Sequence, residues 1–216
     1  MTKIFLIAGM GADTRIYNNI ELPENYDIIP VDWIEPHKTD TLTTYSQKLI
    51  YQYNILPNSI LIGNSMGGMI AIEIAKKLNI KKTVLISSIK TISEAPSYYK
   101  LFRALPIYKI LPNSFIKGAG YLIKPVFGKM SDADLWLFKD MLQKNSPAFI
   151  KWAMGAVLKW DNTVIPPNVY HIHGDNDLVL PITKIKDATI IKGGTHIMIF
   201  DKAKQINKWL KPLLKK

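Results

Sequence analysis

A serine between two glycines stands at the junction of an apolar run and a helical pattern. Residues 63–67 read G-N-S-M-G, with the apolar run SILI just before them and the helical spacing of Met66–Leu78 after it. A chain turns this sharply only where the flanking positions two residues before and after the serine lack side chains, as Gly63 and Gly67 do. Backbone N–H groups at the head of the helix would then face the serine and favour a developing oxyanion. The pattern predicts that Ser65 is a nucleophile.

A serine hydroxyl is a weak nucleophile and needs a base, for which the chain offers four histidines. His37 lies in a polar stretch after a proline, which is typical of an exposed loop. His171 and His173 lie two apart in an apolar run, which indicates strand histidines packed on one face. His196 follows two glycines just beyond the last apolar run, and catalytic groups of open α/β sheets gather beyond the carboxyl ends of strands. We therefore predict that His196 is the base.

Two aspartates are candidates for the acid that orients His196. Asp175 and Asp177 both follow the apolar run Asn168–Gly174. Asp175 stands at the end of this run, where an aspartate commonly accepts local backbone N–H groups and closes the turn. Asp177 lies deeper in the loop. Position alone leaves both candidates open.

The elements that would position these residues alternate between short apolar runs and helical patterns. This alternation is the signature of an α/β fold with a mostly parallel sheet and helices on both faces. The predicted strands are Ile4–Gly9, Asp27–Trp33, Ser59–Gly63, Lys82–Ser88, Asn168–Gly174 and Thr189–Gly194. The predicted helices between and after them are Thr41–Tyr53, Met66–Leu78 and a segment from about Lys202 to Leu214.

The middle of the chain interrupts this alternation. Residues 91–165 contain no β-rich run and are rich in aromatic residues. Helices are predicted over Ser131–Lys144, which opens with a capping-box-like serine, and over Ser146–Trp160, which has proline at its first helical position. We expect one domain in which residues 1–90 and 166–216 form the core and residues 91–165 form an inserted helical cap.

The order of nucleophile, acid and histidine resembles that of the α/β-hydrolase fold superfamily. The segment His173–Pro181, HGDNDLVLP, is similar to the family's H-G-x-x-D-x-x-V-P-like segment, whose second acidic position belongs to the triad. The resemblance implies that Asp177 orients His196. It also implies a serine hydrolase that cleaves an ester or related acyl bond through an acyl-enzyme.

The resemblance further implies an oxyanion hole made of the backbone N–H groups of Met66 and Met10. The family's loop after the first core strand often reads H-G-x-G, whereas this chain has Ala8 in place of the histidine. The N-terminal part is also too short for the family's first two antiparallel strands. We therefore expect a trimmed sheet of about six strands.

The substrate is indicated only by the aromatic residues of the insertion. An apolar acyl or aryl group would gain burial energy against them. Residues at such helical spacing also suit the insertion's own core. The candidate substrate-binding residues are Trp136, Phe138, Phe149 and Trp152.

Composition limits the remaining functions. The 216 residues include no cysteine, which excludes disulfides and thiolate metal sites, and we expect neither a metal nor an organic cofactor. The apolar run Ile4–Ala8 is too short for a signal peptide, and no run approaches the roughly 20 apolar residues of a membrane span, so we expect a cytoplasmic protein.

The net charge of +11 raises nucleic acid and anionic membrane surfaces as partners. Only Arg15 and Arg103 among the 28 basic residues are arginine, which disfavours phosphate and guanine recognition, so we expect a small-molecule substrate and no nucleic acid. Two alternatives stay open: a ligand-binding protein on a hydrolase scaffold, and a lipase or thioesterase acting at a membrane surface. The sequence does not indicate an oligomeric state.

Overall fold

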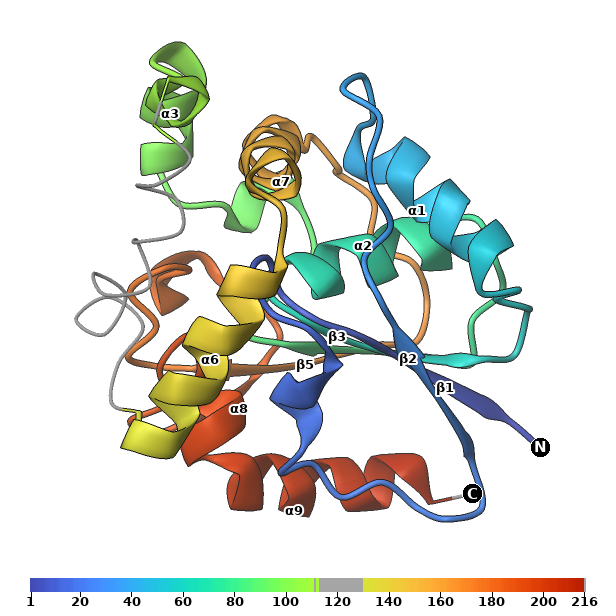
Figure 1. Ribbon diagram of the computed structural model, residues 1–216. Coiled ribbons are helices and arrows are strands. Elements are labelled where there is room, and N and C mark those ends of the chain that lie inside the picture. Colours follow the sequence, from blue (N-terminus) through green and yellow to red (C-terminus); the bar gives the residue numbers. More distant parts are fainter. Residues whose placement is uncertain (111, 113–129, 216) are drawn as a thin grey trace.

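The chain folds around a single parallel sheet (Figure 1). The computed structural model describes residues 1–110, 112 and 130–215. Six strands follow one another in the order β2-β1-β3-β4-β5-β6, and every neighbouring pair is parallel. The prediction of an α/β fold with about six strands is confirmed. The strands are β1 (Lys3–Ile7), β2 (Asp27–Val31), β3 (Ile60–Asn64), β4 (Lys82–Ile86), β5 (Val169–Gly174) and β6 (Thr189–Ile191).

Strand sequences reflect their places in the sheet. β3 lies at the centre and is buried at every position, as expected where helices cover both faces of a sheet. β2 lies at an edge, and it contains Pro30, which pairs with Leu6 of β1 on one side. A proline is tolerated there because an edge strand has a side that makes no ladder hydrogen bonds.

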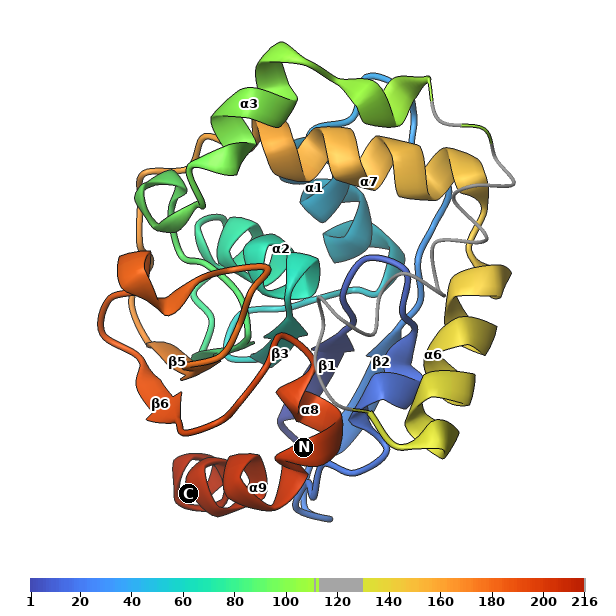
Figure 2. The ribbon, with the colours of Figure 1, turned by 90° about the vertical axis from the view of Figure 1, so that its left-hand side faces the viewer.

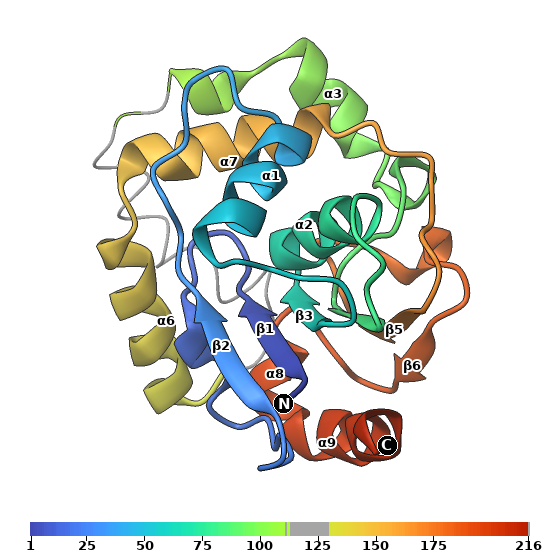
Figure 3. The same ribbon diagram turned by 90° about the vertical axis from the view of Figure 1, so that its right-hand side faces the viewer.

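Helices cover both faces of the sheet (Figures 1 and 3). One face carries α1 (Leu42–Gln52) and α2 (Met66–Ala75), and all ten residues of α2 are buried. The other face carries η1 (Thr14–Tyr17), α8 (Met198–Asp201) and α9 (Ala203–Leu214). Two apolar cores result, one on each side of the sheet.

The chain between β4 and β5 holds the helices of the insertion. Within the described residues these are η2 (Ile92–Glu94), α3 (Tyr98–Ala104), η3 (Ile107–Lys109), α6 (Asp132–Lys144) and α7 (Pro147–Lys159). α7 lies over α1 and α2, whereas α6 runs down the side of the molecule past η1 (Figure 2). Ser131 and Ser146 cap α6 and α7 with their hydroxyls, which accept the N–H groups of Asp134 at 3.1 Å and Phe149 at 3.0 Å. Within the described ranges, no helix has both the length and the apolar character needed to cross a membrane.

Candidate active site

Ser65 stands at the turn from β3 into α2 in a backbone conformation that most residues avoid. Its φ is +51° and its ψ is −120°, a strained state that costs about 1–3 kcal/mol. Glycines make the turn possible, because a Cβ at Gly63 would lie 2.4 Å from the Gly67 carbonyl oxygen and one at Gly67 would lie 2.1 Å from that of Ile7. Ser88 supports the turn from β4 by donating its hydroxyl to the Ser65 carbonyl at 2.6 Å.

The Ser65 hydroxyl points to His196 rather than to its own helix. Ser65 occupies the N-cap position of α2, but its side chain makes no capping hydrogen bond. Its Oγ lies 3.0 Å from Nε2 of His196. His196 sits in the loop after β6 and is only 4% exposed. The two residues therefore meet at the carboxyl edge of the sheet, although one belongs to the first half of the chain and the other to the last part.

Asp177 holds the other side of the imidazole. One carboxylate oxygen, Oδ2, lies 2.8 Å from His196 Nδ1, and the other, Oδ1, accepts the backbone N–H groups of Val179 at 2.9 Å and Leu180 at 2.7 Å. Burial acts to raise the pKa of Asp177, but His196 and the backbone donors outweigh it and hold that pKa below its ordinary value. The ionised carboxylate accepts a hydrogen bond from Nδ1–H, which leaves Nε2 as an acceptor for the Ser65 hydroxyl.

A close backbone contact joins the loop after β5, residues 175–181, to the loop after β6, residues 192–197. We call the first the acid loop, because it carries Asp177, and the second the histidine loop, because it carries His196. Gly174 at the end of β5 meets Gly194 after β6 so closely that a Cβ at Gly174 would lie 2.2 Å from the Gly194 carbonyl oxygen. That carbonyl accepts the Asn176 N–H at 2.9 Å. Asp175 accepts the Gly193 N–H at 2.6 Å, so its carboxylate ties the two loops together. Of the two aspartates that position alone left open, Asp177 is the one hydrogen-bonded to His196.

A second histidine touches the acid loop. His173 of β5 is fully buried, and its Nε2 donates to the Leu180 carbonyl at 2.8 Å and lies 3.5 Å from Asp177 Oδ2. His171, two residues earlier, packs edge-on against the ring of His173. Burial lowers the pKa of both imidazoles. The sequence indicated packed strand histidines, but it gave no sign that His173 also braces the loop of Asp177.

The loop after β1 passes beside Ser65. A Cβ at Gly9 would lie 3.2 Å from Ser65 Cβ. Met10, which follows Gly9, is half-buried, and Met66 opens α2, where the first backbone N–H groups have no partner within the helix. Ala8, at the position of the family's histidine, is fully buried. The role of the Met10 and Met66 N–H groups in an oxyanion hole stays a prediction.

Two of the predicted substrate-binding residues belong to α6. Trp136 is 69% exposed, whereas Phe138 is buried in the core on the α9 side of the sheet. These placements give Trp136 a surface position and Phe138 a structural one. Their part in substrate binding stays a prediction.

The other two predicted substrate-binding residues belong to α7 and pack among aromatic side chains. The ring of Phe149 lies 5.3 Å from that of Trp33. Trp152 lies 4.4 Å from the ring of Tyr45, and its Nε1 donates to the Asp40 carbonyl at 2.8 Å. This cluster joins α7 to α1 and to the loop after β2, and a role in substrate binding stays a prediction here too.

Solved structures of similar shape include three named enzymes. An esterase from Exiguobacterium antarcticum is 19% identical, with a TM-score of 0.76 over 100% of this chain and 92% of that chain. A thermophilic esterase from Thermogutta terrifontis is 15% identical, with a TM-score of 0.75 over 100% and 91%. A bromoperoxidase from Bacillus anthracis is 21% identical, with a TM-score of 0.73 over 100% and 92%. At these identities the likeness concerns the fold.

A comparison with curated proteins gave no match. The profile of the alpha/beta hydrolase family matches residues 7–209, which cover β2 to β6 and the three hydrogen-bonded residues Ser65, His196 and Asp177. The protein therefore belongs to the alpha/beta hydrolase family.

Proposed function

We propose that the protein is a serine hydrolase that cleaves an ester or related acyl bond of a small, largely apolar substrate. The observation that carries the proposal is the continuous chain of contacts from Ser65 Oγ to His196 Nε2 at 3.0 Å and from His196 Nδ1 to Asp177 Oδ2 at 2.8 Å. A serine hydroxyl aligned with an imidazole that a buried carboxylate orients is the arrangement that activates serine for attack.

In the first half of the reaction, Ser65 Oγ attacks the substrate carbonyl carbon while its proton passes to His196 Nε2. Asp177 stabilises the resulting imidazolium through Nδ1–H. The tetrahedral intermediate collapses as His196 returns the proton to the leaving alkoxide, which departs as an alcohol and leaves an acyl group on Ser65. Water then attacks the acyl-enzyme by the same route and releases the carboxylic acid.

The negative charge of the tetrahedral intermediate needs hydrogen-bond donors. In this proposal they are the backbone N–H groups of Met66, at the positive end of α2, and of Met10, in the loop beside Ser65. Loss of one such donor typically costs about 10²–10³ in kcat. The geometry of the loop that carries Met10 therefore matters for the rate.

A fluorophosphonate probe tests the nucleophile, because it reacts with serines that a base and an oxyanion hole activate. We expect one label per chain, which peptide mapping assigns to Ser65 and which Ser65→Ala abolishes. Ser146→Ala, at the cap of α7, is the matched control and should label normally. A label on another residue, or equal labelling of Ser65→Ala, would contradict the proposal.

Turnover separates the hydrolase from a ligand-binding protein on the same scaffold. Two of the similar structures are named esterases, which favours ester substrates. We expect a series of chromogenic esters of graded acyl length to be hydrolysed with burst kinetics, and Ser65→Ala to bind the same esters without turnover. A protein that binds these esters but releases no more product than its Ser65→Ala variant is a binding protein.

A further inference from the structure

The loop after β1 is held between the nucleophile and the insertion. We call residues 8–13 the β1 loop. On one side Gly9 lies against Ser65, and on the other a Cβ at Gly11 would lie 2.9 Å from Leu142 Cδ1 of α6. Gly11 has a φ of +78°, which favours glycine. A displacement of α6 would therefore move the backbone next to Met10.

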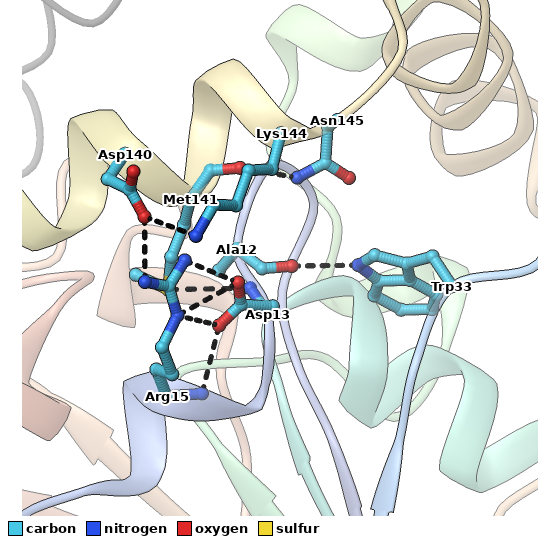
Figure 4. A network of polar contacts seen from close by, with 8 residues as sticks. All are labelled: Ala12, Asp13, Arg15, Trp33, Asp140, Met141, Lys144 and Asn145. Carbon is cyan, nitrogen blue, oxygen red and sulfur yellow. Dashed lines mark hydrogen bonds and ion pairs between the residues drawn. The ribbon is translucent and has the colours of Figure 1, made fainter.

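A charged cluster joins the β1 loop to α6 (Figure 4). The guanidinium of Arg15 donates Nε–H to Asp13 Oδ1 at 2.9 Å and Nη2–H to Asp13 Oδ2 at 2.7 Å. Its third nitrogen, Nη1, donates to Asp140 Oδ2 of α6 at 2.7 Å. Lys144 reaches the same Asp140 oxygen at 2.9 Å and has a side chain that is 61% exposed. One planar guanidinium thus bridges a carboxylate of the β1 loop and a carboxylate of the insertion.

Two neutral contacts fix the β1 loop at the same place. The Asp13 N–H lies 3.4 Å from the Met141 sulfur of α6. The Ala12 carbonyl accepts the indole N–H of Trp33 at 2.8 Å (Figure 4). The Asp13 side chain and the backbone of the β1 loop are therefore both held by contacts with residues outside the loop, on α6 and at Trp33.

We propose that Arg15 is a positioning residue for the oxyanion hole: by joining Asp13 to Asp140 it fixes the β1 loop, and with it the Met10 N–H, against α6. The inference rests on the proposed function. Arginine suits this role because its rigid fork binds one carboxylate with two nitrogens and keeps a third for another, which the single ammonium of lysine cannot do. Arg15 is one of only two arginines among 28 basic residues.

Steady-state kinetics of Arg15→Gln and Asp140→Asn test the inference, with the concentration of active sites taken from fluorophosphonate labelling of Ser65. A displaced oxyanion donor weakens binding of the transition state and leaves ground-state binding in place. We expect kcat per labelled site to fall by about 10-fold with KM within about 2-fold, since the donor is shifted rather than removed. The inhibition constant of phenylboronic acid, a tetrahedral analogue, should rise by the same factor as kcat falls.

Three further variants sharpen the test. The double variant Arg15→Gln/Asp140→Asn should lose no more than the worse single variant, because both changes break one bridge. Arg15→Lys should recover only part of the rate. Lys144→Met, the matched control on the solvent side of Asp140, should keep wild-type kcat and boronate inhibition. Asp140→Asn lies on a partly exposed helix face and tests the bridge even where Arg15→Gln does not fold.

Specific results would overturn the inference. One is an unchanged kcat per labelled site, with any loss of activity matched by a loss of labelled sites, because Arg15 would then serve stability alone. Another is a raised KM at constant kcat, and a third is an equal loss in Lys144→Met. Absence of label and turnover in the wild-type protein would instead refute the proposed hydrolase, so the two failures are distinguishable.

Discussion

Among the serines that begin helices in the described part of the chain, Ser65, Ser131 and Ser146 use their hydroxyls differently. Ser131 and Ser146 have φ values of −62° and −67°, and their hydroxyls cap α6 and α7. Ser65 has a φ of +51°, which turns its hydroxyl away from the free N–H groups of α2 and toward His196. The backbone conformation, not the residue type, decides whether the hydroxyl caps a helix or is available for chemistry.

The two aspartates of the acid loop should respond differently to amide substitution. Asp177→Asn removes the charge that stabilises the imidazolium and permits the wrong imidazole tautomer, so we expect kcat to fall by about 10⁴. Asp175→Asn keeps an acceptor for the Gly193 N–H and should retain kcat within about 2-fold, with at most about 1 kcal/mol of stability lost. Ester hydrolysis and urea unfolding of both variants measure this. The assignment is wrong if a folded Asp175 variant loses turnover while the Asp177 variant keeps it.

The sequence predicted the candidate site in part. Ser65 and His196 could be predicted from nearby glycines. A sharp turn requires glycines around Ser65, and the two glycines before His196 indicate a loop beyond the end of a strand. The choice between Asp175 and Asp177 needed the family resemblance, because it depends on the contact between Gly174 and Gly194, which no local pattern encodes. Arg15 could not be predicted at all, because its partner Asp140 lies 125 residues away.

At the scale of elements, all six predicted strands are present, but several end earlier than the apolar runs suggest. β4 stops at Ile86 because Ser87 adopts a φ of +47°, and β6 stops at Ile191 before Gly193, whose φ is +69°. The short helices η1 and α8 were not predicted, because four residues are too few to display a helical period. Both helices directly follow loops of the candidate site, the one that carries Met10 and the one that carries His196, so the missed elements lie next to that site.

The contact between β5 and the histidine loop gives a prediction at this scale. Gly174→Ala would place a Cβ 2.2 Å from the Gly194 carbonyl oxygen, so the two loops must separate and Asp177 must move from His196. We expect a loss of at least about 2 kcal/mol in the free energy of unfolding and of most activity. Thermal unfolding and ester hydrolysis measure both.

Gly155→Ala is the control for that change. It lies within α7, and its added Cβ would meet the end of the Tyr108 side chain, which can rotate away. Helix propensity favours alanine over glycine by about 1 kcal/mol. We therefore expect a Tm equal to or above that of the wild type and normal activity. Equal damage in both variants would mean that loss of glycine, rather than the loop contact, is responsible.

At the scale of the whole molecule, we expect the free energy of unfolding to decrease in two stages as the pH is lowered. Burial holds the pKa of His171 well below 6.5, so the unfolded chain takes up the proton first, and stability is lost as the pH falls below 6.5. The pKa of Asp177 is below its ordinary 3.8, so its contribution is present above 3.8 and is lost as the pH falls through its folded value. We therefore expect acid to destabilise the folded protein through these two buried groups.

His171→Phe should reduce the first of these stages. Urea unfolding between pH 4.5 and 7 should give a smaller dependence of the free energy of unfolding on pH, since each unit of pKa shift corresponds to about 1.4 kcal/mol. An unchanged slope in His171→Phe would show that the pKa of His171 does not differ between the folded and unfolded states.

The strand that leads into the histidine loop is the shortest of the sheet, and this should affect how long the active site stays intact. β6 has three residues, lies at the edge and pairs with β5 alone, and Ile190 within it is 44% exposed. Such edges open locally far more often than central strands. We expect the amide hydrogens of β6 to exchange with deuterated solvent well before those of β3, and catalysis to cease at urea concentrations at which the tryptophan signal is still native. The lifetime of the active enzyme would then be set by the opening of one short strand; equal exchange rates in β3 and β6 would disprove it.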